Sequence, residues 1–124
     1  MRIIPTRVHG MLDYLMGAVL IIFPWLLDLE SDAAIWVPVI LGAGAIAYSL
    51  LTDYELGVLR RLPMSTHLIL DMLSGTVLAA SPWLFGFADE VWVPHVVLGI
   101  LEIGAAMMTQ TIPADEARGA RRPA

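Results

Sequence analysis

Two histidine–aspartate pairs are the side chains in this sequence best suited to chemistry. His9 precedes Asp13 by four residues, and His67 precedes Asp71 by the same spacing. That spacing places both members of a pair on one stripe of a helix. Neighbouring imidazole and carboxylate groups can relay protons, ligate divalent transition metals or hold two helices together. The chemistry available therefore depends on whether the fold brings the two pairs to one place.

Both pairs lie at the start of long apolar segments. Four such segments can be distinguished, at about residues 8–27, 33–51, 66–85 and 91–112. Each holds about 20 residues, which as a helix span the roughly 30 Å hydrocarbon core of a bilayer. With 58% apolar and only 15% charged residues, the chain lacks the polar surface of a soluble domain. We therefore predict an all-α bundle of four transmembrane helices in contact with the lipid bilayer.

The arginines and tryptophans predict how this bundle is oriented. All seven basic residues are arginines that precede the first span, connect the second to the third or follow the fourth: Arg2, Arg7, Arg60, Arg61, Arg118, Arg121 and Arg122. The tryptophans lie at the opposite ends of the spans: Trp25, Trp36, Trp83 and Trp92. Basic residues favour the cytoplasmic side and tryptophans form interfacial belts. We therefore expect a multi-pass protein with both termini in the cytoplasm.

The chain also contains an internal repeat. Six residues recur at an offset of 58: Pro5, His9, Asp13, Gly17, Pro24 and Trp25 return as Pro63, His67, Asp71, Gly75, Pro82 and Trp83. Trp36-Val37-Pro38 returns as Trp92-Val93-Pro94 at an offset of 56. Residues 1–57 and 58–112 are therefore predicted to be two tandem two-helix repeats with the same orientation, the parallel arrangement. Residues 113–124 form a cytoplasmic tail that we expect to be disordered.

One motif of the repeat resembles a known family. Ser81-Pro82-Trp83 at the end of the third span, within a repeated two-span unit, is similar to the SPW-repeat family of small bacterial membrane proteins. The resemblance extends from about Pro5 to Thr111 and implies a location in the bacterial cytoplasmic, or inner, membrane. The first copy departs from the motif, since it has Phe23 where the second has Ser81. The resemblance supports the fold and carries no biochemical activity to this chain.

The repeated prolines and tryptophans have a structural interpretation. Pro24 and Pro82 cannot donate a hydrogen bond to the carbonyls four residues earlier, so each is expected to bend a helix end into the outer turn. Pro38 and Pro94 are expected in the first turn of the following helix, where a missing N–H costs little. The adjacent tryptophans, Trp25, Trp36, Trp83 and Trp92, would anchor these ends at the membrane interface.

Counting inward from the tryptophans predicts a polar layer. Asp13 and Asp71 each lie 12 residues from a tryptophan, or about 18 Å along a helix. Tyr48 and Glu102 fall at similar depths, and His9 and His67 would lie one turn nearer the cytoplasm. Small residues permit close helix contact, and the glycines expected to pack helices are Gly17, Gly75, Gly42 and Gly44.

Four interpretations of this layer remain open. It can be a structural clasp in which each acid bonds a partner on a neighbouring helix, or a route for protons or other ions. It can bind a divalent metal through its histidines and carboxylates, or it can ligate haem through His9 and His67, with the aspartates orienting the imidazoles. No cofactor is firmly predicted, although haem and a divalent metal both fit the residue types.

No catalytic signature is recognisable. The sequence has no cysteine, no nucleophile–base–orienter set and no phosphate-binding glycine loop, so we do not expect an enzyme. Without a basic stripe on a soluble domain, nucleic-acid binding is not expected. The leading interpretation is a structural or accessory membrane subunit that acts through helix packing, as a homo-oligomer or with another membrane protein. The alternative is a small transporter-like oligomer that uses the Asp/Glu/His layer.

Overall fold

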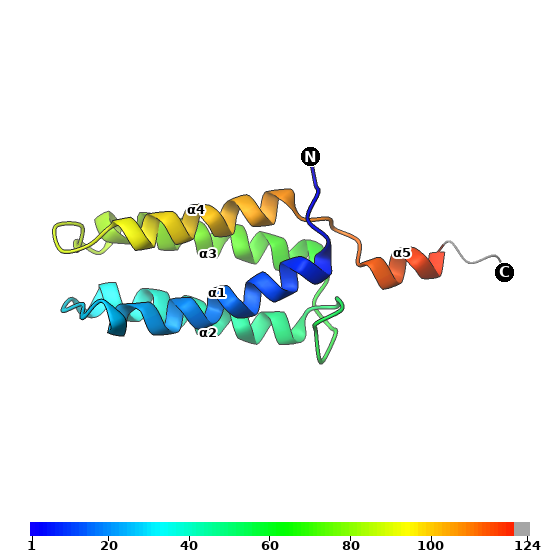
Figure 1. The fold of residues 1–124 in the computed structure, drawn as a ribbon, viewed down its shortest axis with the longest axis horizontal. Coiled ribbons are helices and arrows are strands. Elements are labelled where there is room, and N and C mark those ends of the chain that lie inside the picture. The colour runs from blue at the N-terminus through cyan, green and yellow to red at the C-terminus, as the bar shows by residue number, and fades with distance from the viewer. Residues whose placement is uncertain (121–124) are drawn as a thin grey trace.

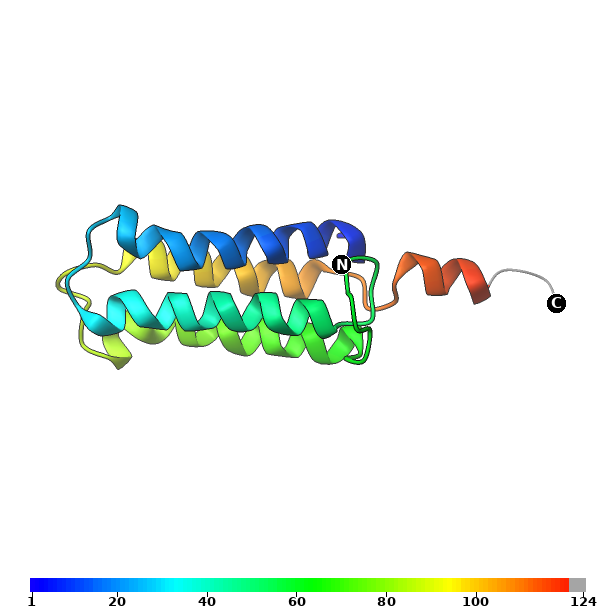
Figure 2. The same cartoon turned by 90° about the horizontal axis from the view of Figure 1, so that it is seen from below.

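The computed structural model describes residues 1–120, and within them the regular secondary structure is helical apart from two isolated β-bridges. Four long helices form a bundle: α1 Thr6–Leu26, α2 Asp32–Leu51, α3 Met64–Leu84 and α4 Val93–Met108 (Figure 1). α1 packs on α2 and α3 packs on α4, and α2 and α3 join these two hairpins. The short connections between α1 and α2 and between α3 and α4 lie at one end of the bundle, and the N-terminus lies at the other (Figure 2). The predicted all-α class is correct.

Each hairpin begins at a proline that sets the register of its first helix. Pro5 and Pro63 are the N-cap residues of α1 and α3, with extended backbones. Their carbonyls accept hydrogen bonds from the backbone N–H of His9 at 3.0 Å and of His67 at 3.1 Å. A proline fits this place because its fixed φ suits the entry to a helix. Both histidines are thereby placed in equivalent first turns.

The ends of α2 and α4 are equivalent as well. α2 is followed by Thr52 and α4 by Thr109, each with an extended backbone. Thr52 forms a parallel β-bridge with Leu62, and Thr109 forms one with Ile4. α4 therefore ends four residues earlier than the predicted Ile112, because the chain leaves the helix to pair with the segment before α1. The predicted disordered tail differs too: Ala114–Ala120 form the short helix α5, and residues 121–124 lie outside the described part.

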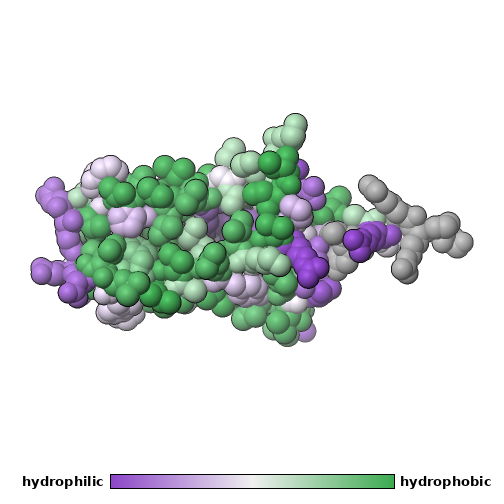
Figure 3. Space-filling view, in the orientation of Figure 1, coloured by the Kyte–Doolittle hydropathy of each residue, from purple (hydrophilic) through white to green (hydrophobic). Residues whose placement is uncertain are grey.

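The outer surface of the bundle is apolar. Large hydrophobic side chains such as Leu15, Ile40 and Ile100 are more than half exposed, and Figure 3 shows hydrophobic residues along the bundle with hydrophilic ones gathered towards its ends. By length and hydropathy, α1 and α2 could each cross a membrane, and α4 is apolar but shorter, at 16 residues. Burying so much apolar surface in lipid is favourable, whereas exposing it to water is not.

Close glycine contacts hold each hairpin together. A Cβ atom at Gly42 would lie 2.7 Å from the carbonyl oxygen of Gly17, and one at Gly75 would lie 2.7 Å from that of Gly99. Three of the four glycines predicted to pack helices therefore do so. Gly44 makes no such contact within the bundle: a Cβ there would meet nothing within 4 Å among the described residues, because Gly44 faces outward from α2. Gly99, which the sequence analysis did not single out, takes its place.

Pro82 frees a carbonyl near the outer end of α3 that another side chain binds. Pro82 lies inside α3, and the Ser81 hydroxyl donates a 2.6 Å hydrogen bond to the carbonyl of Leu78, the one that Pro82 cannot reach. Pro94 lies in the first turn of α4 as predicted. Pro38 does not, because α2 already begins at Asp32 and Pro38 lies inside it.

The tryptophans pair across each hairpin at the same end. The rings of Trp25 and Trp36 have centroids 5.9 Å apart, and those of Trp83 and Trp92 are 6.1 Å apart. All four rings are about half exposed, as expected for aromatic side chains that face an interface. They mark one end of the bundle, opposite the histidine–aspartate pairs.

Candidate functional site: a buried histidine–aspartate cluster

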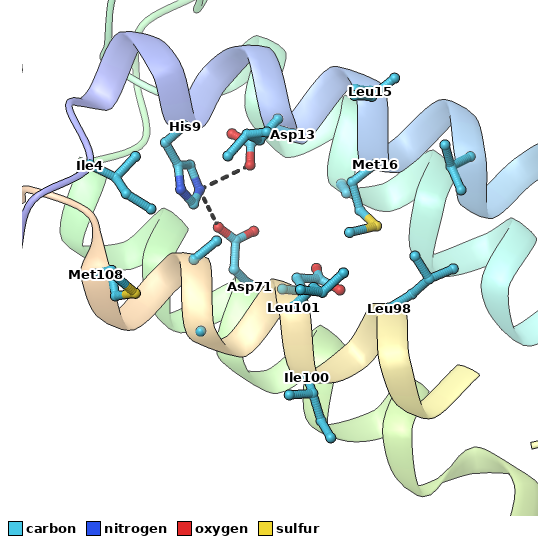
Figure 4. Close-up of a pocket in the computed structure, with 16 residues that line it drawn as sticks. Ile4, His9, Asp13, Leu15, Met16, Asp71, Leu98, Ile100, Leu101 and Met108 are labelled. Atoms are coloured by element: carbon cyan, nitrogen blue, oxygen red, sulfur yellow. Dashed lines mark hydrogen bonds and ion pairs between the residues drawn. The ribbon is translucent and has the colours of Figure 1, made fainter. Parts of the chain in front are cut away.

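The two histidine–aspartate pairs meet in the interior, between α1 and α3. His9 Nε2 lies 2.9 Å from an Asp13 oxygen and 2.8 Å from Asp71 Oδ2. His67 Nε2 lies 3.0 Å from Asp13 Oδ2 and 3.1 Å from Asp71 Oδ2. None of the four residues is more than 8% exposed. Figure 4 shows His9 directed at both carboxylates. We call these four residues the His–Asp cluster.

Two threonines fix the other nitrogen of each imidazole. Thr109 Oγ1 lies 2.6 Å from His9 Nδ1, and Thr52 Oγ1 lies 2.7 Å from His67 Nδ1. Each hydroxyl donates its hydrogen to the carbonyl four residues earlier. Thr109 donates to the carbonyl of Ala105, and Thr52 donates to that of Tyr48. A hydroxyl has only one hydrogen to donate, so each threonine must accept from the imidazole. Both histidines therefore carry a proton on Nδ1.

Two tyrosines hold the carboxylates. The Tyr48 hydroxyl, from α2, donates to Asp71 Oδ1, and the Tyr54 hydroxyl donates to Asp13 Oδ2 at 3.0 Å. Tyr54 belongs to the connection between α2 and α3 and is fully buried. Burial, followed by the charge of Asp13, raises the pKa of the Tyr54 hydroxyl. It therefore remains a hydrogen-bond donor.

The connection that carries Tyr54 folds over the cluster because α1 has no side chain in its way. A Cβ atom at Gly10 would lie 2.8 Å from both Leu56 Cδ1 and Tyr54 Cε2. The Tyr14 hydroxyl then donates a 2.9 Å hydrogen bond to the carbonyl of Leu56. The segment thus covers the end of the cluster that is nearest the N-terminus.

Glu102 lies beside the cluster and is not part of it. It lines a groove of about 610 Å³ that α1 and α4 border, together with His9, Asp13 and Asp71. Glu102 is 7% exposed, and its Oε2 has no hydrogen-bond partner among residues 1–120. The walls of the groove are otherwise apolar, as Met16, Leu98 and Leu101 show in Figure 4. The predicted polar layer therefore consists of the His–Asp cluster and a separate acid beside it, and both border the same groove.

His9 and His67 lie one helical turn before Asp13 and Asp71 in α1 and α3, and their imidazoles reach the carboxylates and share one site with them. The same geometry argues against bis-histidine haem ligation. The imidazole centroids are 5.4 Å apart, and Asp13 and Asp71 occupy the space that a porphyrin between them would need.

The burial pattern corrects the register of the repeat in α2 and α4. The buried residues of α2 from Pro38 onward match those of α4 at an offset of 57: Pro38, Gly42, Ala45 and Ser49 correspond to His95, Gly99, Glu102 and Ala106. The offset of 56 had paired Glu102 with Ile46 and His95 with Val39. The Trp-Val-Pro identities mislead here, because α2 begins before its tryptophan and α4 begins after its own.

His95 has a role that the sequence analysis did not foresee. Its Nε2 lies 2.9 Å from the carbonyl oxygen of Ala34, the one to which Pro38 would donate if it had an N–H. The fully buried imidazole packs between the rings of Phe23 and Phe87, at 5.3 and 4.8 Å. His95 thus joins the two hairpins near the tryptophan end and compensates for a proline in the other hairpin.

Thr52, Thr109 and Tyr54 were not predicted to belong to the site. The two threonines recur at the offset of 57, so a repeat aligned in the correct register would have revealed them. Tyr54 lies in a connection where the repeat does not extend, and no sequence signal distinguishes it. The threonines that contact the histidines are therefore duplicated in the two hairpins, whereas the tyrosines that bind the carboxylates are not.

Comparison with known proteins identifies the family. No curated protein and no solved structure matches this chain. A model of the SPW repeat domain, in contrast, matches residues 7–109, which include the His–Asp cluster and all four long helices apart from one residue of α1. Together with the apolar helices, this match indicates a small membrane protein. The chain belongs to the SPW repeat family.

Proposed function

We propose that this protein is a four-span subunit of the bacterial cytoplasmic membrane that acts through helix packing and not as an enzyme. Its two hairpins have the same orientation, both termini are cytoplasmic, and its outward helix faces meet lipid and a membrane partner or a second copy. The observation that carries the proposal is the division of polarity. The polar groups of the His–Asp cluster bind one another inside the bundle, while the outer surface is apolar.

The equivalent contacts of the two hairpins support a tandem arrangement. His9, in the first hairpin, contacts the threonine that ends the second, and His67 contacts the threonine that ends the first. The β-bridges show the same exchange: Ile4, before the first hairpin, pairs with Thr109, and Leu62, before the second hairpin, pairs with Thr52. Such reciprocal contacts are what a twofold relation between two copies of one unit produces. With 21 residues, α3 is as long as α1, which is sufficient to cross a bilayer.

The absence of cysteine from the chain makes the topology easy to test. Asp89→Cys places an exposed thiol at the tryptophan end, and Leu59→Cys places one at the other end. We expect a membrane-impermeant maleimide to label Asp89→Cys in intact cells and Leu59→Cys only after permeabilisation. Labelling of both thiols from outside, or of neither, would refute the four-span topology with cytoplasmic termini.

The packing role can be tested by cross-linking in the membrane. A photoreactive residue in place of Leu101, which lines the groove between α1 and α4, is expected to capture a second copy or another membrane protein. The matched control is Ile40, which is 65% exposed and is not among the groove-lining residues. If neither site yields a protein adduct and the native protein migrates as a monomer, the accessory role is refuted.

A second candidate, ion movement, is favoured by Glu102. A buried carboxylate oxygen without a partner is costly in a membrane interior, and transporters use such groups on their pathways. Protein reconstituted in vesicles with a pH-sensitive dye tests this candidate. Proton flux that is lost in Glu102→Gln would support it, and wild-type flux no greater than that of empty vesicles would exclude proton movement.

A further inference from the structure

The interior of the His–Asp cluster is a set of electron-pair donors that face one another. Because the threonines accept from Nδ1, a neutral imidazole at His9 or His67 has only a lone pair on Nε2. Each Nε2 lies 2.8–3.1 Å from oxygens of both aspartates. His67 Nε2 has no partner in hydrogen-bond geometry within residues 1–120, although it is fully buried. Lone pairs at this separation repel unless a positive charge lies between them.

The charges of the cluster define what that positive charge must be. Two carboxylates contribute two negative charges, and removing them from water without compensation is very unfavourable. Two protons, one on each imidazole, restore neutrality. One divalent cation restores it equally well and leaves both imidazoles neutral, the state in which histidine is a ligand. No arginine, the only basic residue type besides histidine in the sequence, belongs to the cluster.

The dimensions of the cluster suit a tetrahedral ion. One nitrogen or oxygen from each of the four residues can be chosen so that all four atoms lie within 4.8 Å of one another. Bonds of about 2.0–2.1 Å to a tetrahedral zinc ion give ligand–ligand distances of about 3.3 Å. Because Asp13 contacts the two imidazoles through different oxygens, one oxygen from each aspartate gives at most three nitrogen–oxygen contacts of 2.8–3.1 Å. The side chains would therefore shift towards the tetrahedral spacing when the ion binds.

The groups that surround the cluster have the form of an outer shell. Metal-bound histidines usually donate their second N–H to an oxygen, and metal-bound carboxylates usually accept a hydrogen bond. Here Thr109 and Thr52 receive the two Nδ1 protons. Tyr48 and Tyr54 donate to the two carboxylates. Every candidate ligand is therefore oriented by a group that would not itself touch the ion.

We propose that His9, Asp13, His67 and Asp71 bind one divalent first-row transition-metal ion of the zinc type at the junction of the two hairpins. Two imidazole nitrogens favour such an ion over magnesium or calcium, which prefer oxygen ligands alone. Because each hairpin supplies one histidine and one aspartate, the ion joins the hairpins at the end opposite the tryptophans. This site goes beyond the proposed packing role, which stands whether or not the ion binds.

The test uses the full-length protein purified in detergent, stripped with a chelator and titrated with Zn²⁺ or Co²⁺. We expect one ion per chain in the wild type and loss of binding in His67→Asn and Asp71→Asn. Glu102→Gln is the matched control, because it neutralises a buried acid beside the cluster that is not a ligand, and it should still bind one ion. Helical circular dichroism establishes that each variant is folded.

A variant that retains all four ligands distinguishes a specific loss of ion binding from a loss caused by misfolding. Thr109→Val removes the acceptor of the His9 Nδ1 proton, together with the hydroxyl's bond to the Ala105 carbonyl, and leaves all four ligands in place. It should therefore bind the ion about 10–100-fold more weakly than the wild type. The proposal is overturned if folded wild-type protein takes up neither Zn²⁺ nor Co²⁺, or if folded His67→Asn and Asp71→Asn bind as the wild type does. The cluster would then be held by protons alone, and the cysteine-labelling result would be unaffected.

Discussion

The two hairpins carry the same ligand set and differ in what supports it. Each contributes one histidine and one aspartate to the His–Asp cluster, and one terminal threonine that contacts the histidine of the other hairpin. Several other polar residues are not duplicated: Tyr48 and Tyr54, which bind the carboxylates, have no tyrosine counterparts, and Glu102 corresponds to Ala45 and His95 to Pro38. The histidines and aspartates of the two hairpins meet at one centre, whereas Glu102 lies beside it and His95 lies near the tryptophan end. Matched substitutions in the two hairpins therefore show which contributions to the free energy of unfolding come from the His–Asp cluster and which come from contacts present in only one hairpin.

Substitutions of the aspartates should lower the free energy of unfolding the most. Asp71→Ala removes the carboxylate that contacts His9, His67 and Tyr48, and Asp13→Ala removes the equivalent carboxylate. Breaking a buried ion pair from one side costs about 3–5 kcal/mol. Asp71→Ala should be the more damaging, because Asp71 Oδ2 contacts both imidazoles whereas Asp13 uses a different oxygen for each.

Equilibrium unfolding in mixed detergent micelles measures both variants. A loss of only about 1 kcal/mol or less, as at an exposed ion pair, would contradict a buried and coupled cluster. Equal losses for the two variants would mean that sharing one oxygen confers no extra stability.

The tyrosines test whether helix and loop support are equivalent. Tyr48→Phe and Tyr54→Phe each remove one hydrogen bond to a carboxylate, worth about 1.5–3 kcal/mol. Tyr48 lies on α2, whereas Tyr54 lies on a connection that can move away and admit water to Asp13. We expect the loss of stability in Tyr48→Phe to lie near the upper end of this range and the loss in Tyr54→Phe to lie near the lower end.

Hydrogen exchange of residues 52–63 distinguishes the two tyrosine variants further. Tyr54→Phe should accelerate exchange there, while Tyr48→Phe should not. Unchanged exchange in Tyr54→Phe would show that packing alone retains this segment.

The equivalent glycines should differ because their neighbours differ. A Cβ at Gly75 meets the Gly99 carbonyl at 2.7 Å, which is backbone, while one at Gly17 first meets the Ile46 side chain at 2.5 Å. Gly75→Ala should cost about 1–3 kcal/mol as an overpacked contact, and Gly17→Ala less, since Ile46 can rotate. Gly104→Ala is the control, because a Cβ there meets nothing within 4 Å among the described residues.

The same unfolding assay ranks the three glycine variants. If Gly104→Ala is as destabilising as Gly75→Ala, the cost reflects substitution in a helix in general and not the approach of α3 to α4. If Gly17→Ala costs as much as Gly75→Ala, Ile46 is held as firmly as backbone.

The positions of the helices can be predicted from the sequence because they follow from hydropathy and segment length alone. Apolar segments of membrane length, bounded by polar connections, place α1 to α4 to within a few residues of their observed bounds, apart from the C-terminal end of α4. The i, i+4 spacing puts each histidine and aspartate on one stripe, and the repeat at an offset of 58 suggests that both pairs reach the same depth. That much follows from periodicity, and it is enough to predict that these groups share a region.

Other features depend on geometry that a single sequence does not encode locally. The Trp-Val-Pro motif suggested an offset of 56, but the helix interiors follow 57, since a motif near a turn can shift relative to the helix after it. Tyr54 reaches Asp13 only because the connection folds back over Gly10. The partner of His95 is a carbonyl in the other hairpin, freed by Pro38, and no spacing rule relates them.

The smallest expected effect concerns Ser81, where the second hairpin has a hydroxyl and the first has Phe23. The Ser81 hydroxyl binds the Leu78 carbonyl that Pro82 leaves free. Ser81→Ala should therefore cost about 0.5–1.5 kcal/mol, the net value of a typical hydrogen bond. Ser81→Thr, which keeps the hydroxyl, is the control.

The proline allows this explanation to be tested by a double-mutant cycle. Pro82→Ala restores a backbone N–H that can donate to Leu78, so the cost of Ser81→Ala should be smaller in that background. An identical cost in both backgrounds would show that Ser81 does not act through this carbonyl. A smaller cost would explain why a serine accompanies the proline in the second hairpin: its hydroxyl replaces the donor that the proline removes, in a position where lipid offers none.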